Sequence, residues 1–302
     1  MVNSPLSGKA SRLIGKVDRE WLVKAYSGSF GIDVLPLLPN NIDLALYEDI
    51  EYKYRFFHPF HVTGDDKFYQ GLEKFDWYYM PWKWEHEVSL NYIKNNLKVL
   101  EVGCGSGGFL KKVSSKVGKD NVVGLELNSD AVSRLQAEDY LVYDSDITKF
   151  SSTNKDVFDL VCSFQVLEHI ADVRGFINAK IDCLKRGGKL IISVPNNDST
   201  LFHINYGGAL NYPPHHLGMW NKASLKALQD LFPIKLKKFY FEPLQEYHWD
   251  WYLSIIDYKV DNSSFSRFLK KYPRLKSNLH SLLRLLKPSI KGHSIVAVYE
   301  KQ

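Results

Sequence analysis

The sequence of 302 residues contains few cysteines and no long apolar run. Its three cysteines, Cys104, Cys162 and Cys183, form no Cys-x-x-Cys pair, which argues against a disulfide framework and against a thiolate metal site. No stretch reaches the roughly eighteen apolar residues of a membrane-spanning helix, and no apolar segment follows the basic N-terminus. From these absences we expect that the protein is not an integral membrane protein and is not exported by a signal peptide. They favour a cytoplasmic location.

The sequence also lacks internal repeats and low-complexity tracts. Hydrophobic residues make up 45% and charged residues 24%, which excludes a disordered or collagen-like chain and fits one large domain or two small ones. The formal net charge is +5, and it is unevenly distributed. Eight basic and no acidic residues lie between Asn262 and Tyr299, so this stretch carries +8 and the rest of the chain −3.

Strands and helices alternate from residue 97 onward. We expect strands near 97–105, 121–128, 140–147, 157–164, 187–196, 234–244 and 292–302. Helical patterns lie between them, near 106–118, 129–139, 172–185 and 221–232. This alternation predicts an α/β fold with a parallel sheet covered on both faces.

Two regions do not follow the alternation. Residues 1–80 are rich in aromatic residues and turn formers, and we interpret them as an N-terminal extension and lid before a main domain at 81–302. The second region is an insert at about 244–291, before the last strand. Its leucines at 275, 279, 282 and 286 recur at helical spacing, which predicts an inserted pair of helices.

A glycine-rich turn joins the first strand of the alternation to its helix. Glycines in such a turn let a ligand approach the backbone closely, and the helix N-terminus behind them favours negative groups. Glu126 ends the next strand, where its carboxylate can accept hydrogen bonds from a ribose diol. The glycine turn and Glu126 together predict an adenosine-like ligand. They do not distinguish between nicotinamide, flavin and S-adenosylmethionine cofactors.

Five motifs in order resemble those of class I S-adenosylmethionine-dependent methyltransferases, in particular the small-molecule and glycan-cluster enzymes of the methyltransferase-23 type. The motifs are VLEVGCGSGGFL at 99–110, GLELN at 124–128, SDIT at 145–148, FDLVCSFQVLEHI at 158–170 and LKRGGKLIISVPN at 184–196. The resemblance implies a Rossmann-like, doubly wound, mostly parallel seven-stranded sheet with an antiparallel last strand. It also implies the donor S-adenosylmethionine and the product S-adenosylhomocysteine.

The same resemblance implies a set of cofactor-binding residues. Glu101 and Gly103 would lie against the amino-acid part of the cofactor, Glu126 would bind ribose, and Asp146 with Ile147 would border adenine. Gln165 would face the cofactor near the methyl group. The full set is Glu101, Gly103, Cys104, Gly105, Gly107, Glu126, Leu127, Asp146, Ile147, Gln165, Tyr78 and Tyr79.

Three histidines are candidate catalytic residues. His215 and His216 lie in the loop after the fifth strand, where either imidazole could accept the proton of a hydroxyl group that attacks the methyl carbon. The sequence does not order the two. His169 follows the fourth strand in the pair Glu168-His169, which can instead serve to order the cofactor site.

We expect no metal ion at this site. Quinone-biosynthesis O-methyltransferases have a related Glu-x-x-Glu-His pattern that binds a divalent cation, but its first position here is Gln165, a poorer ligand. Adjacent histidines on an extended segment point to opposite sides, so we do not expect His215 and His216 to bind one ion.

The N-terminal extension contributes two further expectations. An aromatic segment, residues 68–87, is interpreted either as a flap packed on the domain or as a lid over the cofactor, with Tyr78 and Tyr79 as its polar-tipped members. Residues 46–59 resemble the end of a zinc ribbon found in relatives, with Asp49 and Tyr52 at the two cysteine positions. The segment is therefore either a zinc-free remnant or a simple pair of strands.

The function expected is O-methylation of a small-molecule acceptor. The YPPHHLGMW loop at 212–220 and KWEHE at 83–87 are similar to relatives in polysaccharide clusters, which indicates a sugar, nucleotide sugar or glycan precursor. The alternative is a phenolic, quinone or other natural-product acceptor, methylated on oxygen or nitrogen. RNA methylation and a non-catalytic role rank lower, because there is no dedicated nucleic-acid module and the cofactor motifs are intact.

The basic insert indicates a partner. It is interpreted as a solvated helix face or as a surface at 262–291 that meets either an anionic acceptor or an anionic membrane in peripheral contact.

Overall fold

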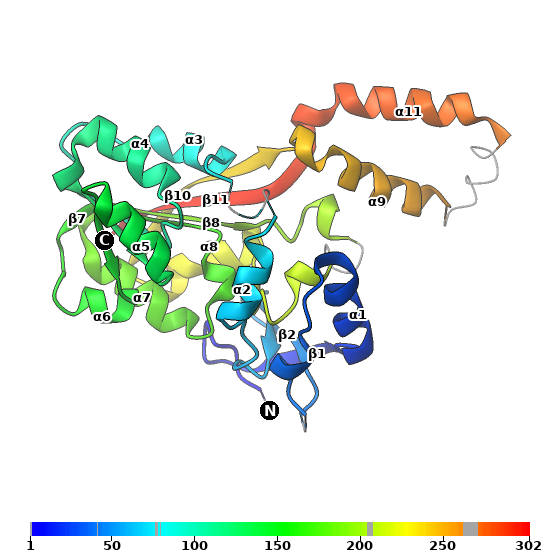
Figure 1. The fold of residues 1–302 in the computed structure, drawn as a ribbon, viewed down its shortest axis with the longest axis horizontal. Helices are drawn as coiled ribbons and strands as arrows, with labels where there is room; N and C mark the ends of the chain where they lie inside the picture. The colour runs from blue at the N-terminus through cyan, green and yellow to red at the C-terminus, as the bar shows by residue number, and fades with distance from the viewer. Residues whose placement is uncertain (1, 41, 76–77, 79, 204–207, 262–270) are drawn as a thin grey trace.

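A computed structural model describes residues 2–40, 42–75, 78, 80–203, 208–261 and 271–302. A seven-stranded sheet forms its centre, with the strand order β10-β11-β8-β7-β4-β5-β6 (Figure 1). These strands are β4 (Val99–Val102), β5 (Val122–Glu126), β6 (Leu141–Asp144), β7 (Phe158–Phe164), β8 (Leu184–Pro195), β10 (Ile234–Pro243) and β11 (Lys291–Lys301).

The sheet confirms the expected topology. β4 pairs in parallel with β5 and β7, β5 with β6, and β7 with β8. β11 runs antiparallel to both β8 and β10. Because the parallel strands all end at one edge, the turns that follow β4, β5, β7 and β8 lie along that edge of the sheet.

Helices cover both faces of the sheet. The helices are α3 (Trp84–Leu90), α4 (Gly108–Val117), α5 (Ser129–Ala137), α6 (Ile147–Ser151), α7 (Val173–Cys183) and α8 (Lys222–Leu231). Figure 1 shows α3 and α4 above the sheet and α6, α7 and α8 below it. Consecutive residues of β7 divide between the two layers: Leu160 and Cys162 pack with α3, α4 and α5, whereas Val161 packs with α7 and α8. This alternation is what a strand buried on both faces requires.

The N-terminal extension forms a small sheet of its own. Its strands β1 (Ser11–Lys16), β2 (Ala45–Asp49) and β3 (Arg55–His58) are joined by β9 (Gly218–Met219), in the order β1-β2-β3-β9. Two helices, α1 (Arg19–Phe30) and α2 (Asp66–Leu72), pack on it. Since β9 belongs to the loop after β8, the extension holds the loop that carries His215 and His216.

The segment at 46–59 is a pair of strands with a tight turn. β2 and β3 pair antiparallel, and the Asp49 carboxylate accepts hydrogen bonds from the backbone N–H groups of Glu51 (3.0 Å) and Tyr52 (2.9 Å). Asp49 therefore stabilises the turn, at a position where a zinc ribbon would have a cysteine.

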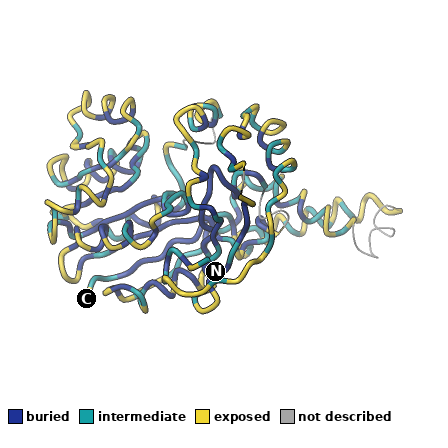
Figure 2. Tube along the Cα trace, turned by 90° about the horizontal axis from the view of Figure 1, so that it is seen from below, coloured by how far each residue is buried: buried dark blue, intermediate teal, exposed yellow. Residues whose placement is uncertain are grey.

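The insert between β10 and β11 forms the expected helical pair. Its helices are α9 (Trp249–Asp261) and α11 (Pro273–Leu285). In both views the pair projects from one end of the molecule, and Figure 2 shows its outer part as largely exposed. Among the residues that the structure describes, no helix combines the length and the apolar character needed to cross a membrane.

Candidate active site

The turn after β4 requires glycine for its backbone conformation and for space. Gly103, Gly105 and Gly107 adopt φ angles of 76°, 53° and 80°, in the left-handed region. A Cβ on Gly103 would lie 2.5 Å from Val166 Cγ2, and one on Gly107 would lie 2.5 Å from Leu135 Cδ2. The backbone of this turn can thus approach a ligand at the N-terminus of α4.

Glu126 lies beside this turn. Its Oε2 accepts a hydrogen bond from the Gly105 N–H at 2.7 Å. Its Oε1 accepts from the N–H groups of Leu127 (2.8 Å) and Asn128 (3.0 Å). The carboxylate at the end of β5 is therefore fixed next to the glycine turn.

Glu101 presents an unsatisfied carboxylate at the same place. The side chain is only 3% exposed, and its Oε2 has no hydrogen-bond partner among the described residues. Burial, and then the charge of Glu126, raise the pKa of Glu101 well above its usual value. A buried carboxylate oxygen without a partner indicates a missing donor, and a cationic ligand group would supply one.

The other predicted cofactor residues differ in what their side chains contact. Leu127 is 68% exposed and offers an apolar surface beside Glu126. Asp146 caps α6, accepting from the Thr148 N–H at 2.7 Å. The side chains of Cys104 and Ile147 are buried in the two core layers. Any contact of Cys104 or Ile147 with a ligand would therefore be made by their backbone.

The aromatic segment reaches both the glycine turn and the histidine loop. The carbonyl oxygen of Pro81 lies where a Cβ on Gly108 would be, 1.9 Å away, so the segment packs against the first residue of α4. The Tyr78 hydroxyl contacts His215 Nε2 at 3.2 Å. The structure thus brings Tyr78 to a candidate base, and Tyr79 lies outside the described residues.

The three candidate histidines form one cluster. The ring of His169 lies edge-on to those of His215 (4.7 Å between centroids) and His216 (4.8 Å). His215 and His216 stack at 4.4 Å with 20° between their planes. The expectation that they point to opposite sides is wrong. Both backbone N–H groups bond to the Tyr212 carbonyl, so the segment is a turn and not an extended strand.

Hydrogen bonds fix the tautomer of each ring. The Nδ1 atoms donate to His215 O (2.6 Å, from His169), Leu210 O (2.9 Å, from His215) and Asn211 Oδ1 (2.9 Å, from His216). Since a carbonyl oxygen can only accept, Nδ1 carries the proton and Nε2 keeps a lone pair. The amide of Asn211 in turn donates to Asn197 Oδ1 at 2.7 Å, which supports the acceptor of His216.

Burial keeps the three imidazoles neutral. It lowers the pKa of His169 to about 4 and the pKa values of His215 and His216 well below the usual value. The Tyr78 hydroxyl occupies the Nε2 of His215, whereas no described residue bonds to the Nε2 of His216. His216 therefore has an available lone pair and a fixed orientation, as a general base requires.

The cluster has the composition of a metal site, because one ligand atom from each histidine lies within 4.8 Å of the others. Imidazole lone pairs lie in the ring plane, and the planes of these two stacked rings are only 20° from parallel. The lone pairs of His215 and His216 therefore do not converge on one ion. The two lone pairs fail to converge because the rings stack, and not because the side chains point to opposite sides as the sequence suggests.

A polar cluster lies at the same edge of the sheet, and Gln165 is its only member among the predicted site residues. We define it as Glu85, Gln165, Glu242 and Ser294. The Gln165 amide nitrogen is 3.2 Å from Glu85 Oε1 and 3.2 Å from Ser294 Oγ. Glu242 accepts from the Ser294 N–H at 2.9 Å, and burial together with the charge of Glu85 raises the pKa of Glu242 to about 7. The sequence singles out Glu85 only as part of KWEHE and does not mark Glu242, and the two come from α3 and β10, far apart in the chain.

Glu168, the residue before His169, is buried. Neither carboxylate oxygen has a hydrogen-bond partner in the described part of the chain. Burial raises the pKa of Glu168 to about 8, so the carboxyl group is largely protonated at neutral pH.

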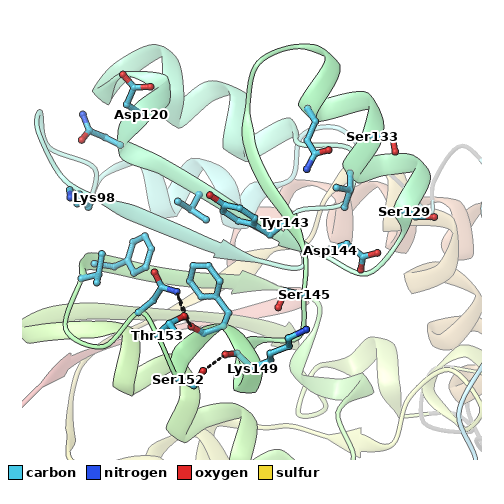
Figure 3. Close-up of a pocket in the computed structure, with 18 residues that line it drawn as sticks. Lys98, Asp120, Ser129, Ser133, Tyr143, Asp144, Ser145, Lys149, Ser152 and Thr153 are labelled. Carbon is cyan, nitrogen blue, oxygen red and sulfur yellow. Dashed lines mark hydrogen bonds between the residues drawn. The ribbon is translucent and has the colours of Figure 1, made fainter.

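A hollow of about 810 Å³ lies elsewhere, along the edge strand β6 (Figure 3). It is lined by polar side chains such as Ser133, Asp144 and Lys149 together with Tyr143, and neither Glu126 nor a candidate histidine lines it. We assign it no part in the site.

Comparison with known proteins gives a consistent result. A family model described as a methyltransferase domain matches residues 77–245, more than half of the chain. A ubiquinone biosynthesis O-methyltransferase of Cereibacter sphaeroides is 28% identical over 194 residues, covering 59% of this chain and 76% of the relative. A protein of the same name from Ruegeria pomeroyi is 28% identical over 180 residues, covering 55% and 71%. A solved structure of a methyltransferase from Archaeoglobus fulgidus covers 71% of this chain and 90% of its own, with 18% identity and a TM-score of 0.49.

Proposed function

The chain belongs to the methyltransferase-domain family and is an S-adenosylmethionine-dependent methyltransferase, and on this premise we propose that it methylates a hydroxyl group of a polar small molecule. The acceptor class is a sugar, nucleotide sugar or glycan precursor. The base is His216. The observation that carries this proposal is the oriented imidazole of His216 at the same sheet edge as a buried cluster of polar groups.

The residues around the glycine turn fit the methyl donor. The unpartnered Oε2 of Glu101 suits the ammonium group of its amino-acid part. Glu126 would bind the ribose hydroxyls, and the exposed Leu127 would pack on the adenine ring. The glycines allow the backbone to pass close to the ligand. S-adenosylmethionine supplies a methyl group already activated by the sulfonium.

The task left to the protein is to orient the acceptor and remove its proton. His216 Nε2 accepts the proton of the attacking hydroxyl, and Asn211 holds the ring through Nδ1. The ring is neutral at the start of the reaction because burial lowers its pKa. Tyr78 and the packed aromatic segment exclude water from this side.

The polar cluster supports a polyhydroxyl acceptor. Glu85 and Glu242 are carboxyl groups that are each 2% exposed. They have partners within the protein, since the Gln165 amide donates to Glu85 and both the Tyr247 hydroxyl and the Ser294 N–H donate to Glu242. The cluster therefore makes this end of the site polar, which suits a hydroxylated acceptor better than a largely apolar ring.

The second candidate acceptor is a phenol or quinone precursor. The names of the relatives favour it, since both are ubiquinone biosynthesis O-methyltransferases. The same base would serve, because a phenolic hydroxyl also loses a proton on methylation.

Transfer of radiolabelled methyl from S-adenosylmethionine to a panel of acceptors tests the proposal. The panel contains free sugars, nucleotide sugars, lipid-linked sugars and dihydroxybenzoates. We expect label in one of the sugar classes, with His216→Gln as the inactive control. Label in the dihydroxybenzoates alone would reject the sugar and establish the second candidate.

A further inference from the structure

The helical pair α9 and α11 leaves one helix almost uncovered. α11 has no buried residue, and the pair stands away from the sheet in both views (Figures 1 and 2). It is joined to the body at its base, where Leu283 and Ile290 pack with Trp249 and Tyr252. A helix so exposed in a folded protein requires a reason for the apolar residues that it carries.

The exposed side of α11 and the residue after it form a leucine stripe. Leu275, Leu279, Leu282 and Leu286 recur at intervals of four, three and four residues and lie on one face. Leu275, Leu282 and Leu286 are 44%, 55% and 48% exposed.

A different face of α11 contacts α9. Lys276 forms an ion pair with Asp257 at 3.0 Å, and His280 contacts the same carboxylate at 3.1 Å. These two residues lie on the side of the helix away from Leu282. The leucine stripe is therefore not the surface that holds the pair together.

The charge on α11 is of one sign. The helix contains Arg274, Lys276 and Arg284 and no acidic residue, whereas α9 contains the acidic residues of the pair. Lys276 and Lys287 are neutralised by ion pairs with Asp257 and Glu246. Arg284 lies on the side of α11 opposite the leucine stripe and interacts with the carboxylate of Glu246. Within the described residues no ion pair engages Lys271, which precedes the helix, or Arg274 in its first turn, so these two remain available to an anionic partner.

We propose that α11 docks on an anionic lipid bilayer in peripheral contact. The leucine stripe enters the boundary between headgroups and acyl chains, and Lys271 and Arg274 at the N-terminal end of the helix bind lipid phosphates. A short amphipathic helix with leucines on one face and basic residues at its end is the form of an interfacial helix. A second copy of this chain fits less well, because two basic helices repel each other. The inference does not depend on which acceptor is methylated.

Cosedimentation with lipid vesicles tests the proposal on the full chain. One set of vesicles is phosphatidylcholine alone, and the other contains phosphatidylglycerol as well. We expect binding to the anionic vesicles only, weakened by added salt. Leu282→Ser with Leu286→Ser should reduce the partition of the protein onto the vesicles by about tenfold or more, and so should Lys271→Glu with Arg274→Glu.

A matched control separates the stripe from exposed leucines in general. Leu13 in β1 is 53% exposed, so Leu13→Ser removes a comparable side chain from another surface and should leave partition unchanged. Thermal unfolding and S-adenosylmethionine affinity, measured on each variant, establish that the fold is intact.

Three results would overturn the proposal. The first is no binding of the wild type to anionic vesicles. The second is binding that neither double variant reduces. The third is a dimer in sedimentation velocity that Leu282→Ser with Leu286→Ser dissociates while vesicle binding is unaffected, which would assign the stripe to a second copy.

Discussion

The rings of His215 and His216 stack at 4.4 Å, yet their Nδ1 atoms donate to different acceptors, Leu210 O and Asn211 Oδ1. Their Nε2 atoms differ as well, because the Tyr78 hydroxyl contacts that of His215, whereas no described residue bonds to that of His216. The two neighbours therefore have separate tasks. His215 links the aromatic segment to the loop, and His216 offers its lone pair to the acceptor.

Substitution of the two histidines tests this division. His216→Gln should lower turnover by about a hundredfold or more, the usual contribution of a general base, with the affinity for S-adenosylmethionine unchanged. His215→Phe keeps an aromatic ring in the stack and should lower turnover by much less. Turnover is measured with the acceptor found in the labelling panel. The opposite ranking would make His215 the base.

Glu126→Gln tests the cofactor site. The substitution removes the charge that would strengthen hydrogen bonds to the ribose, so the Kd for S-adenosylmethionine should rise by roughly ten- to a hundredfold in calorimetry. Glu138→Gln is the control, because Glu138 is an exposed glutamate paired with Lys111. Equal affinities of the Glu126→Gln variant and the wild type would exclude Glu126 from the cofactor site.

Gly108→Ala tests the contact between the aromatic segment and α4. The new Cβ would overlap the Pro81 carbonyl, so the segment must move away from the helix. Chymotrypsin should then cleave within residues 68–87 faster than in the wild type, while the main unfolding transition changes little. Gly28→Ala adds a Cβ in open space and serves as the control. An unchanged cleavage rate would show that the segment does not rest on Gly108.

Replacement of Lys180 by methionine is expected to stabilise the protein by an amount that depends on pH. Lys180 is fully buried, its amino group contacts only Ser163 Oγ among the described side-chain oxygens (2.5 Å), and burial lowers its pKa to about 7. Between about pH 7 and 10.5 the unfolded chain is protonated at this residue and the folded chain is not, so the wild type loses stability as pH falls through this window. Lys180→Met should raise the free energy of unfolding at pH 7 by the order of a few kcal/mol.

Urea unfolding at several pH values measures this effect. The gain of Lys180→Met should shrink as the pH approaches 10.5. The exposed Lys226→Met should show no such trend. A gain that is constant with pH would contradict the assignment.

The contribution of Glu168 to stability is expected to change with pH in the opposite direction to that of Lys180. Burial raises its folded pKa to about 8, whereas the unfolded value is about 4.3. Between these two pH values the folded chain binds this proton and the unfolded chain does not. The contribution of Glu168 to the free energy of unfolding is therefore greatest below about pH 4.3 and is lost as the pH rises through 8. The stability of Glu168→Gln relative to the wild type should therefore increase from pH 5 to pH 8 in urea unfolding. A difference that does not change with pH would show that Glu168 is ionised in the folded protein.

Local sequence patterns predict the sheet and the cofactor side of the site. The glycine turn and Glu126 each depend on one strand end, and the parallel alternation brings those ends together. The polar cluster depends on packing between distant segments: Glu85 comes from α3, and Glu242 comes from β10. A single glutamate in a sequence does not show which element will bury it.

The histidine loop shows the same limit. The sequence marks His215 and His216, but their side chains share one direction because both N–H groups bond to the Tyr212 carbonyl. The loop is held by β9, which pairs with β3 of the N-terminal sheet. That pairing joins residues more than a hundred and fifty positions apart, and the sequence of neither strand identifies the strand with which it pairs.

A crystal structure with bound S-adenosylhomocysteine tests the account most directly, through the distance from its sulfur to His216 Nε2. An S–C bond, a methyl–oxygen contact and one hydrogen bond together span roughly 8 Å. We predict a separation of about that length or less, with Gln165 beside the gap and Glu126 on the ribose. A sulfur that faces away from His216, or an intervening wall of packed side chains, would contradict the assignment of the base.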